Sequence, residues 1–487
     1  MSRRDQWMLR MGATLSGVAV CGAVAVTTAC GSGHENAGVG GSSAAPATGG
    51  TAGDGGSASA ASGGSGAGKA GSSSGATGGT DSGTGGGNVG EGGSGGDAGA
   101  PVIAGDGTEL DPGADGPGYD GVKLTITDLV RPITGCSAFE PTNGTLDLTL
   151  DATAPSAIVR VTSGVVSVNG KACTTADGKT TAKADLVTSV TVTGGAEDNF
   201  VFVDGAGAFG DELLTGGNGF ALELGGGLDV VVALGTDGSD DVRLGMDGDA
   251  LAIDFTGDLV PDIHALDAEQ VVVSTGPMPD TVFADGVDLE LSPVTLPIEL
   301  HGGGANDLLL GGAGSDKLNG GIGNDTLLAG RDPGGADLFV GGDGEDLVDY
   351  AGRTAPVNVT LASGADDGAA DEHDEVDASV ENARGGDGDD HIVGSSSNNK
   401  LWGGPGSDVL IGGDGDDFLY GGEGQDQLEG QEGNDFLYGE GGDDQVNGGN
   451  GDDLLDGYPG TNVLDGGSGD GDVCVPTKAD SATACEL

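Results

Sequence analysis

The sequence predicts an all-β protein whose C-terminal third is a parallel β-roll, a solenoid of short strands joined by glycine-rich turns. Three observations support this fold class. A nine-residue unit recurs between residues 301 and 473, glycine supplies 105 of the 487 residues, and one position of every unit is apolar. Such periodicity indicates stacked repeats in which each unit adds one layer to a continuous core.

The repeat is clearest from Gly403 onward, where the chain reads GGPGSDVLI, GGDGDDFLY and GGEGQDQLE. The sixth position is Asp in most units. These residues form a first run, Asp307, Asp316, Asp325, Asp337 and Asp346, and a second run, Asp390, Asn399, Asp408, Asp417, Asp426, Asp435, Asp444, Asp453 and Asn462. The eighth position is apolar throughout. The alternative, a disordered acidic tail, has no reason to keep that register.

Each unit divides into a turn and a strand. Positions seven to nine form the strand, so the eighth side chain points into a narrow core while its neighbours point outward. The first six residues form the turn, in which glycine permits a positive φ. A carboxylate with several backbone carbonyls is the oxygen set that Ca²⁺ prefers. Two units complete one coil, so each turn should lie beside the turn eighteen residues later.

These residues resemble the RTX, or hemolysin-type calcium-binding, repeat family over about residues 301–474. The resemblance implies a β-roll with several Ca²⁺ ions held between neighbouring turns along both edges. It implies calcium ligation by the sixth-position aspartates, namely Asp307, Asp316, Asp325, Asp337, Asp346, Asp390, Asp408, Asp417, Asp426, Asp435, Asp444 and Asp453. It does not extend to Asn399 and Asn462, because an amide offers an oxygen without a charge.

The composition restricts the partners of the chain. It carries 79 Asp and Glu against 17 Lys and Arg, a formal net charge of −62. That charge rules against nucleic acid as a partner and against docking on anionic lipid. It also opposes compaction. The repeats are therefore expected to fold when cations neutralise them, so that calcium binding contributes folding free energy.

Residues 1–29 are expected to be a signal peptide, in which Arg3, Arg4 and Arg10 accompany an apolar stretch too short for a confident membrane span. The segment ends in Thr-Thr-Ala-Cys, which resembles a bacterial lipobox and implies lipidation of Cys30. An ordinary cleaved signal and an uncleaved anchor are the alternatives. A lipid would anchor the exported protein to the outer membrane or cell surface and would be its only membrane contact. Without it the protein would be extracellular.

The rest of the chain divides by composition. After Cys30, residues 30–118 are rich in Gly, Ser and Ala without a hydrophobic period, which predicts a disordered linker. Alternating β-branched segments predict a small β module over 119–184 and a degenerate β-solenoid over 185–300. The predicted order then continues with the first repeat run (301–350), an acidic insert (351–384), the second run (385–473) and a C-terminal cap (474–487).

Four cysteines lie outside the signal segment and Cys30. Cys136 and Cys173 are expected to form a disulfide, because an exported protein meets an oxidising compartment. Cys474 falls at a core-facing eighth position, and a bridge to Cys485 would fold the last residues over the end of the roll. Two free thiols are the alternative for this second pair.

The acidic insert combines a strand-like segment, Val357-Asn-Val-Thr-Leu, with a dense acidic loop. A solvated loop is the simpler interpretation. The alternative is an extra Ca²⁺ site built from Asp371, Asp374 and Asp377. Zinc binding by His373 is not favoured, because no second histidine lies near it in the sequence.

Aromatic residues recur at the ninth position of every second unit. Trp402, Tyr420 and Tyr438 are eighteen residues apart, and Phe418 and Phe436 occupy seventh positions. On a roll these rings would stack along one outer face, about 4.8 Å apart per coil. The row either stiffens the roll or forms a contact strip for a surface polysaccharide or a protein.

No catalytic constellation is visible in the sequence. The five histidines are scattered, and none belongs to an HExxH motif or a Cys–His pair. The sequence therefore predicts a non-enzymatic, calcium-binding protein of the cell surface or extracellular space with a structural or adhesive role. Two alternatives stay open. One is a secreted hydrolase whose site lies in 119–300, and the other is a calcium-gated stalk that presents a protein partner.

Overall fold

The computed structural model describes residues 139–486, together with residues 109–110, 124–125 and 136. Internal gaps fall at residues 151–154, 163–164, 169–170, 184–185, 205–218, 237, 256, 258, 332–333, 362–364 and 371. The chain divides into two compact units, residues 1–100 and 101–487, and every described residue belongs to the second. The expected signal peptide, Cys30 and most of the linker lie outside the described residues.

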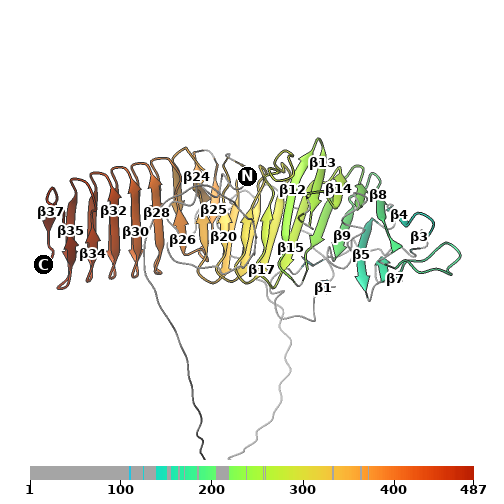
Figure 1. Cartoon of the computed structure of the whole chain (residues 1–487), viewed down its shortest axis with the longest axis horizontal. Coiled ribbons are helices and arrows are strands. Elements are labelled where there is room, and N and C mark those ends of the chain that lie inside the picture. The colour runs from blue at the N-terminus through green and yellow to red at the C-terminus, as the bar shows by residue number, and fades with distance from the viewer. Residues whose placement is uncertain are drawn as a thin grey trace, which may run out of the picture. The chain divides into compact units, whose positions relative to one another are not determined.

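The second unit is built from strands and turns, and its strands form two hydrogen-bonded ladders (Figure 1). Among the described residues, there is no helix that is long and apolar enough to cross a membrane. The first ladder consists, in spatial order, of β3 (Phe139–Glu140), β4 (Thr145–Thr149), β8 (Ser189–Thr193), β10 (Phe220–Glu223), β14 (Ile263–Leu266), β13 (Ala250–Asp254), β12 (Asp241–Asp247), β16 (Thr281–Phe283), β18 (Leu308–Leu310), β20 (Thr326–Leu328), β22 (Leu347–Asp349), β26 (Asn382–Arg384), β28 (Lys400–Pro405), β30 (Phe418–Glu423), β32 (Phe436–Gly441), β34 (Leu454–Asp456) and β36 (Val473–Val475).

The second ladder consists of β7 (Lys171–Ala172), β6 (Val165–Val168), β5 (Ser156–Thr162), β9 (Phe200–Asp204), β11 (Val230–Leu234), β15 (Gln270–Gly276), β17 (Ile298–Gly304), β19 (Lys317–Ile322), β21 (Leu338–Asp343), β25 (Asp374–Val376), β24 (Ala365–Ala369), β23 (Val357–Thr360), β27 (His391–Val393), β29 (Val409–Asp414), β31 (Gln427–Glu432), β33 (Gln445–Asn450), β35 (Val463–Ser468) and β37 (Ser481–Thr483). A separate antiparallel pair joins β1 (Glu109–Leu110) to β2 (Leu124–Thr125).

Parallel pairing keeps the eighteen-residue register of the sequence. Leu419 of β30 pairs with Leu401 of the coil before and with Leu437 of the coil after. These eighth-position side chains are fully buried, whereas the seventh and ninth positions of β30 are half-buried. Every eighth-position residue from Leu309 to Leu464 lies in the same core. The predicted all-β fold with a parallel β-roll is confirmed.

The turns depend on glycine at two positions. In many units the second and fourth residues have positive φ, for example 109° at Gly404 and 151° at Gly406. At the fourth position the backbones of successive coils also touch, because a Cβ on Gly424 would lie 1.3 Å from the carbonyl oxygen of Gly406. Side chains are tolerated at the second position, where Gln431 and Glu440 have φ of 80° and 68°. Glycine is the usual residue at the fourth position, although Ala305 occupies it with a φ of 68°.

Apart from the N-terminal end, where β5, β6 and β7 pair antiparallel, antiparallel strands interrupt the coil twice. In the first ladder, β12 does not pair with β10, the strand before it in this ladder. Instead, β13 and β14 lie between them: β13 pairs antiparallel with β12 and β14, and β14 pairs in parallel with β10. In the second ladder β24 and β25 likewise lie between β23 and β21, and β25 pairs in parallel with β21. The acidic insert is therefore more than a solvated loop, since it supplies β23 to β26. Its apolar residues Val357, Val359 and Val376 are buried in the core and hold these strands in place.

The N-terminal part of the unit joins the same ladders. β4 and β5 belong to the segment expected to form a small module, and they pair in parallel with β8 and β9 of the expected degenerate solenoid. Both ladders therefore continue from the expected small module into the expected solenoid. A disulfide joins Cys136 to Cys173 near this end, and a second joins Cys474 to Cys485 at the other. Cys474 lies in the core beside Leu455, as its eighth-position register requires.

Candidate metal centre

The sixth-position residues form two columns, one along each edge of the stack. Turns that lead from the first ladder to the second carry column one, which contains Asp316, Asp337, Asp390, Asp408, Asp426, Asp444 and Asn462. Turns that lead back carry column two, which contains Asp307, Asp325, Asp346, Asn399, Asp417, Asp435 and Asp453. All of these side chains are buried. The structure therefore brings together, coil upon coil, the residues that the sequence placed at one repeat position.

One carboxylate oxygen of each aspartate ties two coils together. The backbone N–H of Asp390 donates to Oδ1 of Asp408 at 2.8 Å, and the N–H of Asp408 donates to Oδ1 of Asp426 at 2.9 Å. In column two the N–H of Asp417 donates to Oδ1 of Asp435 at 2.9 Å. A hydrogen bond to an ionised acceptor is stronger than a neutral one. Each coil therefore supplies the acceptors that the preceding coil needs.

The other carboxylate oxygen has no hydrogen-bond partner in many of these turns. The buried, unpaired Oδ2 atoms belong to Asp307, Asp325, Asp346, Asp408, Asp417, Asp426, Asp435, Asp444 and Asp453. An ionised oxygen buried without a partner is strongly unfavourable. Its recurrence at one repeat position indicates that a bound cation completes the turn.

Backbone carbonyls lie beside the unpaired oxygens. A Cβ built on Gly403 would lie 2.3 Å from Oδ2 of Asp408 and 2.6 Å from the carbonyl oxygen of Gly421. The space beside this glycine is therefore lined by oxygen atoms of two successive coils. Among the described residues, no three His, Cys, Asp or Glu side chains converge as a metal-binding group. A cation here must take its remaining ligands from carbonyls, which is the donor set of Ca²⁺ rather than of zinc.

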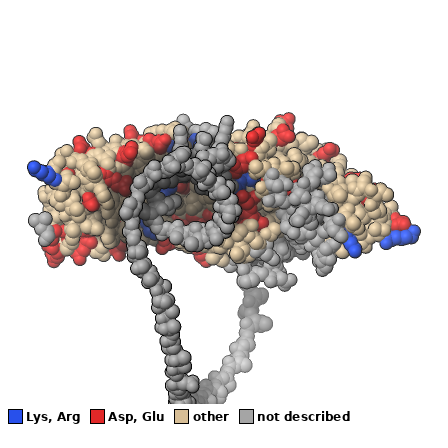
Figure 2. All heavy atoms as spheres, in the orientation of Figure 1, with Lys and Arg blue, Asp and Glu red and all other residues tan. Residues whose placement is uncertain are grey.

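Burial raises the pKa of these carboxyl groups. The pKa of Asp307 rises to about 8, that of Asp417 to about 7 and that of Asp435 to about 6, with desolvation as the largest cause. A hydrogen bond from the preceding coil opposes the rise at Asp417, while the charge of Asp435 adds to it. Figure 2 shows Asp and Glu over the visible surface of the second unit and only scattered Lys and Arg. A divalent cation would relieve this repulsion.

In three turns of the runs, a side-chain oxygen of the sixth residue accepts an N–H from the same turn. Oδ2 of Asp316 accepts the N–H of Gly312 at 2.6 Å, and Oδ2 of Asp390 accepts the N–H of Gly386 at 2.6 Å. Oδ1 of Asn399 accepts the N–H of Ser395 at 2.6 Å. In these turns the second residue does not have the left-handed φ that turns this N–H away elsewhere. Asp316 and Asp390 are therefore poorer candidates for calcium than the other aspartates of the runs.

The acidic insert continues both columns. The N–H of Asp337 donates to Oδ1 of Asp374 at 3.0 Å, and the N–H of Asp346 donates to Oε2 of Glu381 at 2.9 Å. Asp377 accepts the N–H of Ser379 in a local turn. Asp371 lies outside the described residues. The structure thus separates the roles of Asp374 and Asp377 and gives no sign that they form one site.

Further acidic residues extend the columns beyond the two runs. The N–H of Asp280 donates to Oδ1 of Asp307 at 2.8 Å, and the N–H of Asp453 donates to Oδ1 of Asp472 at 3.0 Å. Neither residue was predicted as a site residue. A degenerate copy of the repeat, Pro279-Asp280-Thr-Val-Phe, is the sequence signal for Asp280, and a one-residue insertion displaces Asp472 from the nine-residue register.

Asp229 repeats part of this arrangement outside the runs. Its Oδ1 accepts the N–H of Asn199 at 2.6 Å, and its Oδ2 is buried without a hydrogen-bond partner. Gly225 and Gly227 have φ of 98° and 144°, as in the runs. Leu224, however, places a side chain at the first position, where the runs have the glycine that leaves room beside the carboxylate. We therefore do not assign Asp229 as a calcium ligand.

The aromatic residues form a stacked row on the first ladder. Ring centroids are 4.6 Å apart for Phe418 and Phe436 and 5.1 Å apart for Tyr420 and Tyr438, with interplanar angles of 3° and 16°. Trp402 stacks on Tyr420 at 5.8 Å. The rings therefore cover one another's faces and present mainly their edges.

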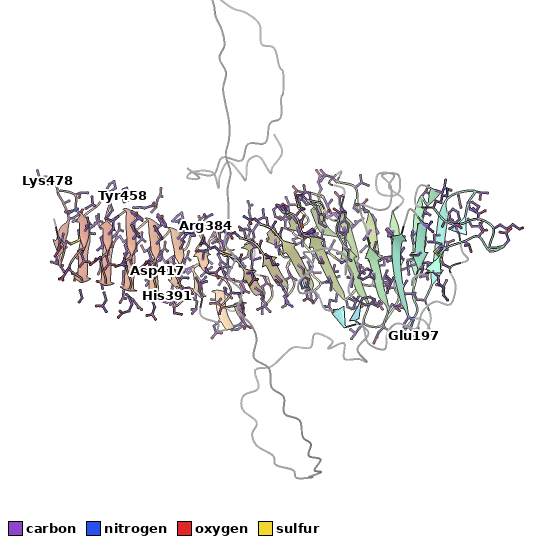
Figure 3. All side chains as sticks on the ribbon, turned by 90° about the horizontal axis from the view of Figure 1, so that it is seen from below. Glu197, Arg384, His391, Asp417, Tyr458 and Lys478 are labelled. Carbon is purple, nitrogen blue, oxygen red and sulfur yellow. A yellow bond between two sulfur atoms is a disulfide. The ribbon has the colours of Figure 1, made fainter. Side chains whose placement is uncertain are left out.

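His391 and His373 take no part in the columns. His391 is exposed, and Figure 3 shows it on the opposite side of the stack from the labelled Arg384 and Tyr458. His373 is exposed within the insert, and its Nδ1 lies 3.1 Å from Oδ1 of Asp366. A single carboxylate beside an exposed imidazole is an ordinary surface contact.

Comparison with known proteins identifies the repeats. Four copies of the RTX calcium-binding nonapeptide repeat match residues 300–332, 384–419, 420–455 and 438–473. No curated protein matches the chain. Nine aspartates of the two runs have an unpaired Oδ2, and the matched segments contain all of these except Asp346. Over this C-terminal part, the chain is an RTX-repeat protein with calcium-binding repeats.

Proposed function

We propose that this protein is an exported, non-enzymatic structural protein whose C-terminal roll folds when Ca²⁺ fills the spaces between successive turns. The observation that carries the proposal is the set of buried Oδ2 atoms without hydrogen-bond partners. Without a cation these oxygens repel one another across successive coils. With Ca²⁺ they become ligands, and binding free energy becomes folding free energy that grows with free Ca²⁺.

Export and surface attachment are part of the proposal. Two disulfides support an oxidising compartment, and extracellular Ca²⁺ is abundant enough for modules that bind it in about the millimolar range. Lipidation at Cys30 would place the roll at a membrane surface on a long linker. Globomycin treatment of expressing cells, followed by mass spectrometry of the mature N-terminus, tests the lipid. A mature chain that starts at an unmodified residue other than Cys30 would exclude it.

The central experiment is a Ca²⁺ titration of the full chain followed by circular dichroism. We expect loss of β-structure in EGTA and its recovery with added Ca²⁺. The double variant Asp417→Asn with Asp435→Asn should raise the midpoint, because two turns each lose a charged ligand while keeping the Oδ1 acceptor. Asp465→Asn removes an exposed carboxylate from β35 and is the matched control. Equal order in EGTA and in Ca²⁺, without retained metal, would refute the proposal.

Two other functions remain testable on the same protein. A hydrolase would show activity in a substrate screen of the full chain and would lose it on substitution of acidic residues in 119–300. A calcium-gated stalk would retain a protein partner in Ca²⁺ and release it in EGTA. We favour the structural role, because the regular contacts of the two columns run along the stack and do not converge on one cleft.

A further inference from the structure

The two calcium-binding runs are separated by a segment with different chemistry. We call residues 349–390 the junction, of which 362–364 and 371 are not described. In the described part of the junction, no buried carboxylate oxygen lacks a hydrogen-bond partner. Asp367 accepts two backbone N–H groups at 2.8 and 3.0 Å, and Asp390 accepts two at 2.9 and 2.6 Å. The buried acids of the junction are therefore satisfied by donors of the protein itself.

A buried arginine lies at the centre of the junction. Arg353 is 2% exposed, and its Nη2 donates to Oε1 of Glu372 at 2.5 Å and to the carbonyl oxygen of Ala329 at 2.9 Å. Glu372 also accepts the N–H of Gly334 at 3.0 Å and the N–H of Ala369 at 2.7 Å. One ion pair thus ties the last turns of the first run to the strands of the insert.

The arginine stands beside a member of column one. Asp374 is fully buried, and its Oδ1 accepts the N–H of Asp337 as a sixth-position aspartate would. Its Oδ2, the oxygen that is unpaired in the runs, accepts the hydroxyl of Tyr350 at 3.1 Å. The ion-pair partner of Arg353, Glu372, lies two residues before Asp374 in the same insert. The hydroxyl of Tyr350 therefore satisfies the oxygen that is unpaired in the runs, and the guanidinium of Arg353 supplies a positive charge at the neighbouring Glu372.

The junction also differs from the runs in whether its negative charges need calcium to be compensated. In the runs the compensating charge must come from solution, so the free energy of unfolding falls as Ca²⁺ is withdrawn. In the junction the positive charge is attached to the chain and an arginine stays protonated. Breaking a buried ion pair leaves an uncompensated charge and is strongly unfavourable. The junction should therefore keep its structure when the runs lose theirs.

The other interruption of the coil has a similar arginine. Arg243 of β12 is 2% exposed, pairs with Asp241 and donates from Nε to Asp288 at 2.8 Å. Its guanidinium lies 4.6 Å from the ring centroid of Phe283. Both the β12–β14 interruption and the β23–β25 interruption thus contain a buried, acid-paired arginine.

We propose that Arg353 substitutes for a bound cation, so that the junction stays folded without calcium and separates two calcium-dependent runs. The proposal rests on the proposed function, because it needs runs that lose structure in EGTA. It makes the junction a preformed coil on which both runs can order as calcium rises. Nucleation on such a coil avoids part of the entropic cost of starting a solenoid from a disordered chain.

Hydrogen exchange of the full chain, with and without Ca²⁺, tests the proposal. In EGTA we expect peptides from 350–361 and 372–384 to exchange at least about tenfold more slowly than peptides from 408–455. In Ca²⁺ both sets should be protected. If the runs stay protected in EGTA, the proposed function fails. If the junction exchanges as fast as the unprotected runs, only the junction proposal is overturned.

Two substitutions assign the effect to the arginine. Arg353→Gln should abolish the protection of the junction in EGTA, whereas Arg353→Lys, which keeps the charge, should retain part of it. Arg384→Gln is the control, because Arg384 is a partly exposed arginine paired with Asp349 in the same junction. Unchanged protection in Arg353→Gln would overturn the proposal. If that variant does not fold even in Ca²⁺, the exchange pattern of the unsubstituted protein decides.

Discussion

Asp417 and Asp435 stand one coil apart, and the N–H of Asp417 donates to Oδ1 of Asp435 while Oδ2 of Asp435 has no hydrogen-bond partner. One carboxylate therefore has two tasks. It links two coils through one oxygen and offers the other to a cation. The two tasks can be separated experimentally, because asparagine keeps an oxygen acceptor and loses the charge.

Asp435→Asn should lower the number of bound Ca²⁺ ions and raise the calcium midpoint of folding by about tenfold, since affinity depends on the number of charged ligands. Asp390→Asn is the matched control, because both oxygens of Asp390 already accept backbone N–H groups. Isothermal titration calorimetry gives the stoichiometry, and circular dichroism gives the midpoint. Equal effects of the two substitutions would contradict the distinction between paired and unpaired turns.

Acidification should have opposite effects on the calcium-free and calcium-bound forms. Burial raises the pKa of Asp408 to about 7 from its ordinary 3.8, with repulsion from neighbouring aspartates as a smaller cause. Because the folded pKa lies above the unfolded one, the calcium-free fold binds protons more tightly than the unfolded chain. Its stability is therefore greatest below pH 3.8 and is lost as the pH rises towards 7.

Calcium competes with the same protons. Its apparent affinity should increase between about pH 5 and pH 7 and then level off, as the carboxyl groups of the columns become ionised. The measurement is a set of Ca²⁺ titrations at several pH values, together with circular dichroism in EGTA at pH 5 and pH 8. Less β-structure in EGTA at pH 5 than at pH 8 would contradict the proposed sign.

Gly424 tests how closely the turns approach. A Cβ at this fourth position would lie 1.3 Å from the carbonyl oxygen of Gly406, and φ is 152°. Gly424→Ala should therefore lower the free energy of unfolding of the calcium-bound roll by about 3 kcal/mol or more, through overpacking and backbone strain. Gly441→Ala is the control, because its nearest atoms would be 3.5 and 4.0 Å away. Chemical denaturation in excess Ca²⁺ compares the two variants.

The sequence alone predicted the roll because two signals coincide in it. The eighth-position residues such as Leu419 and Leu437 report the core, and the sixth-position aspartates report the turn. Each signal recurs so often that an occasional exception such as Asn399 does not obscure it. The disulfide between Cys474 and Cys485 could be inferred because Cys474 keeps the same register.

The sequence could not show which aspartates keep an unpaired oxygen. Asp390 and Asp408 are preceded by similar residues, GGDGD and GGPGS, yet Gly386 donates its N–H to Asp390 and Gly404 has a φ of 109°. The difference comes from the preceding coil, which is the insert in one case and a repeat in the other. The path of the insert was hidden for the same reason, since the pairing of β25 with β21 spans a break in the period.

The aromatic row provides the last test, because stacking and partner binding predict different results. The faces of Tyr420 and Tyr438 are covered by each other and by Trp402, so sugar rings cannot stack on them as they would on an isolated platform. We expect Tyr420→Ala with Tyr438→Ala to lower the free energy of unfolding of the calcium-bound form by about 1–3 kcal/mol. Denaturation in Ca²⁺ measures this loss. Tyr458→Ala is the control, since Tyr458 is 44% exposed and only tilted against Tyr438.

The same variants should bind surface polysaccharide no more weakly than the unsubstituted protein. A pull-down on intact cells in Ca²⁺, with equal amounts of folded protein confirmed by circular dichroism, makes the comparison. Loss of cell association in the double variant, with its stability unchanged, would instead make the row a contact strip. The edges of the rings would then carry the interaction, because their faces remain stacked within the row.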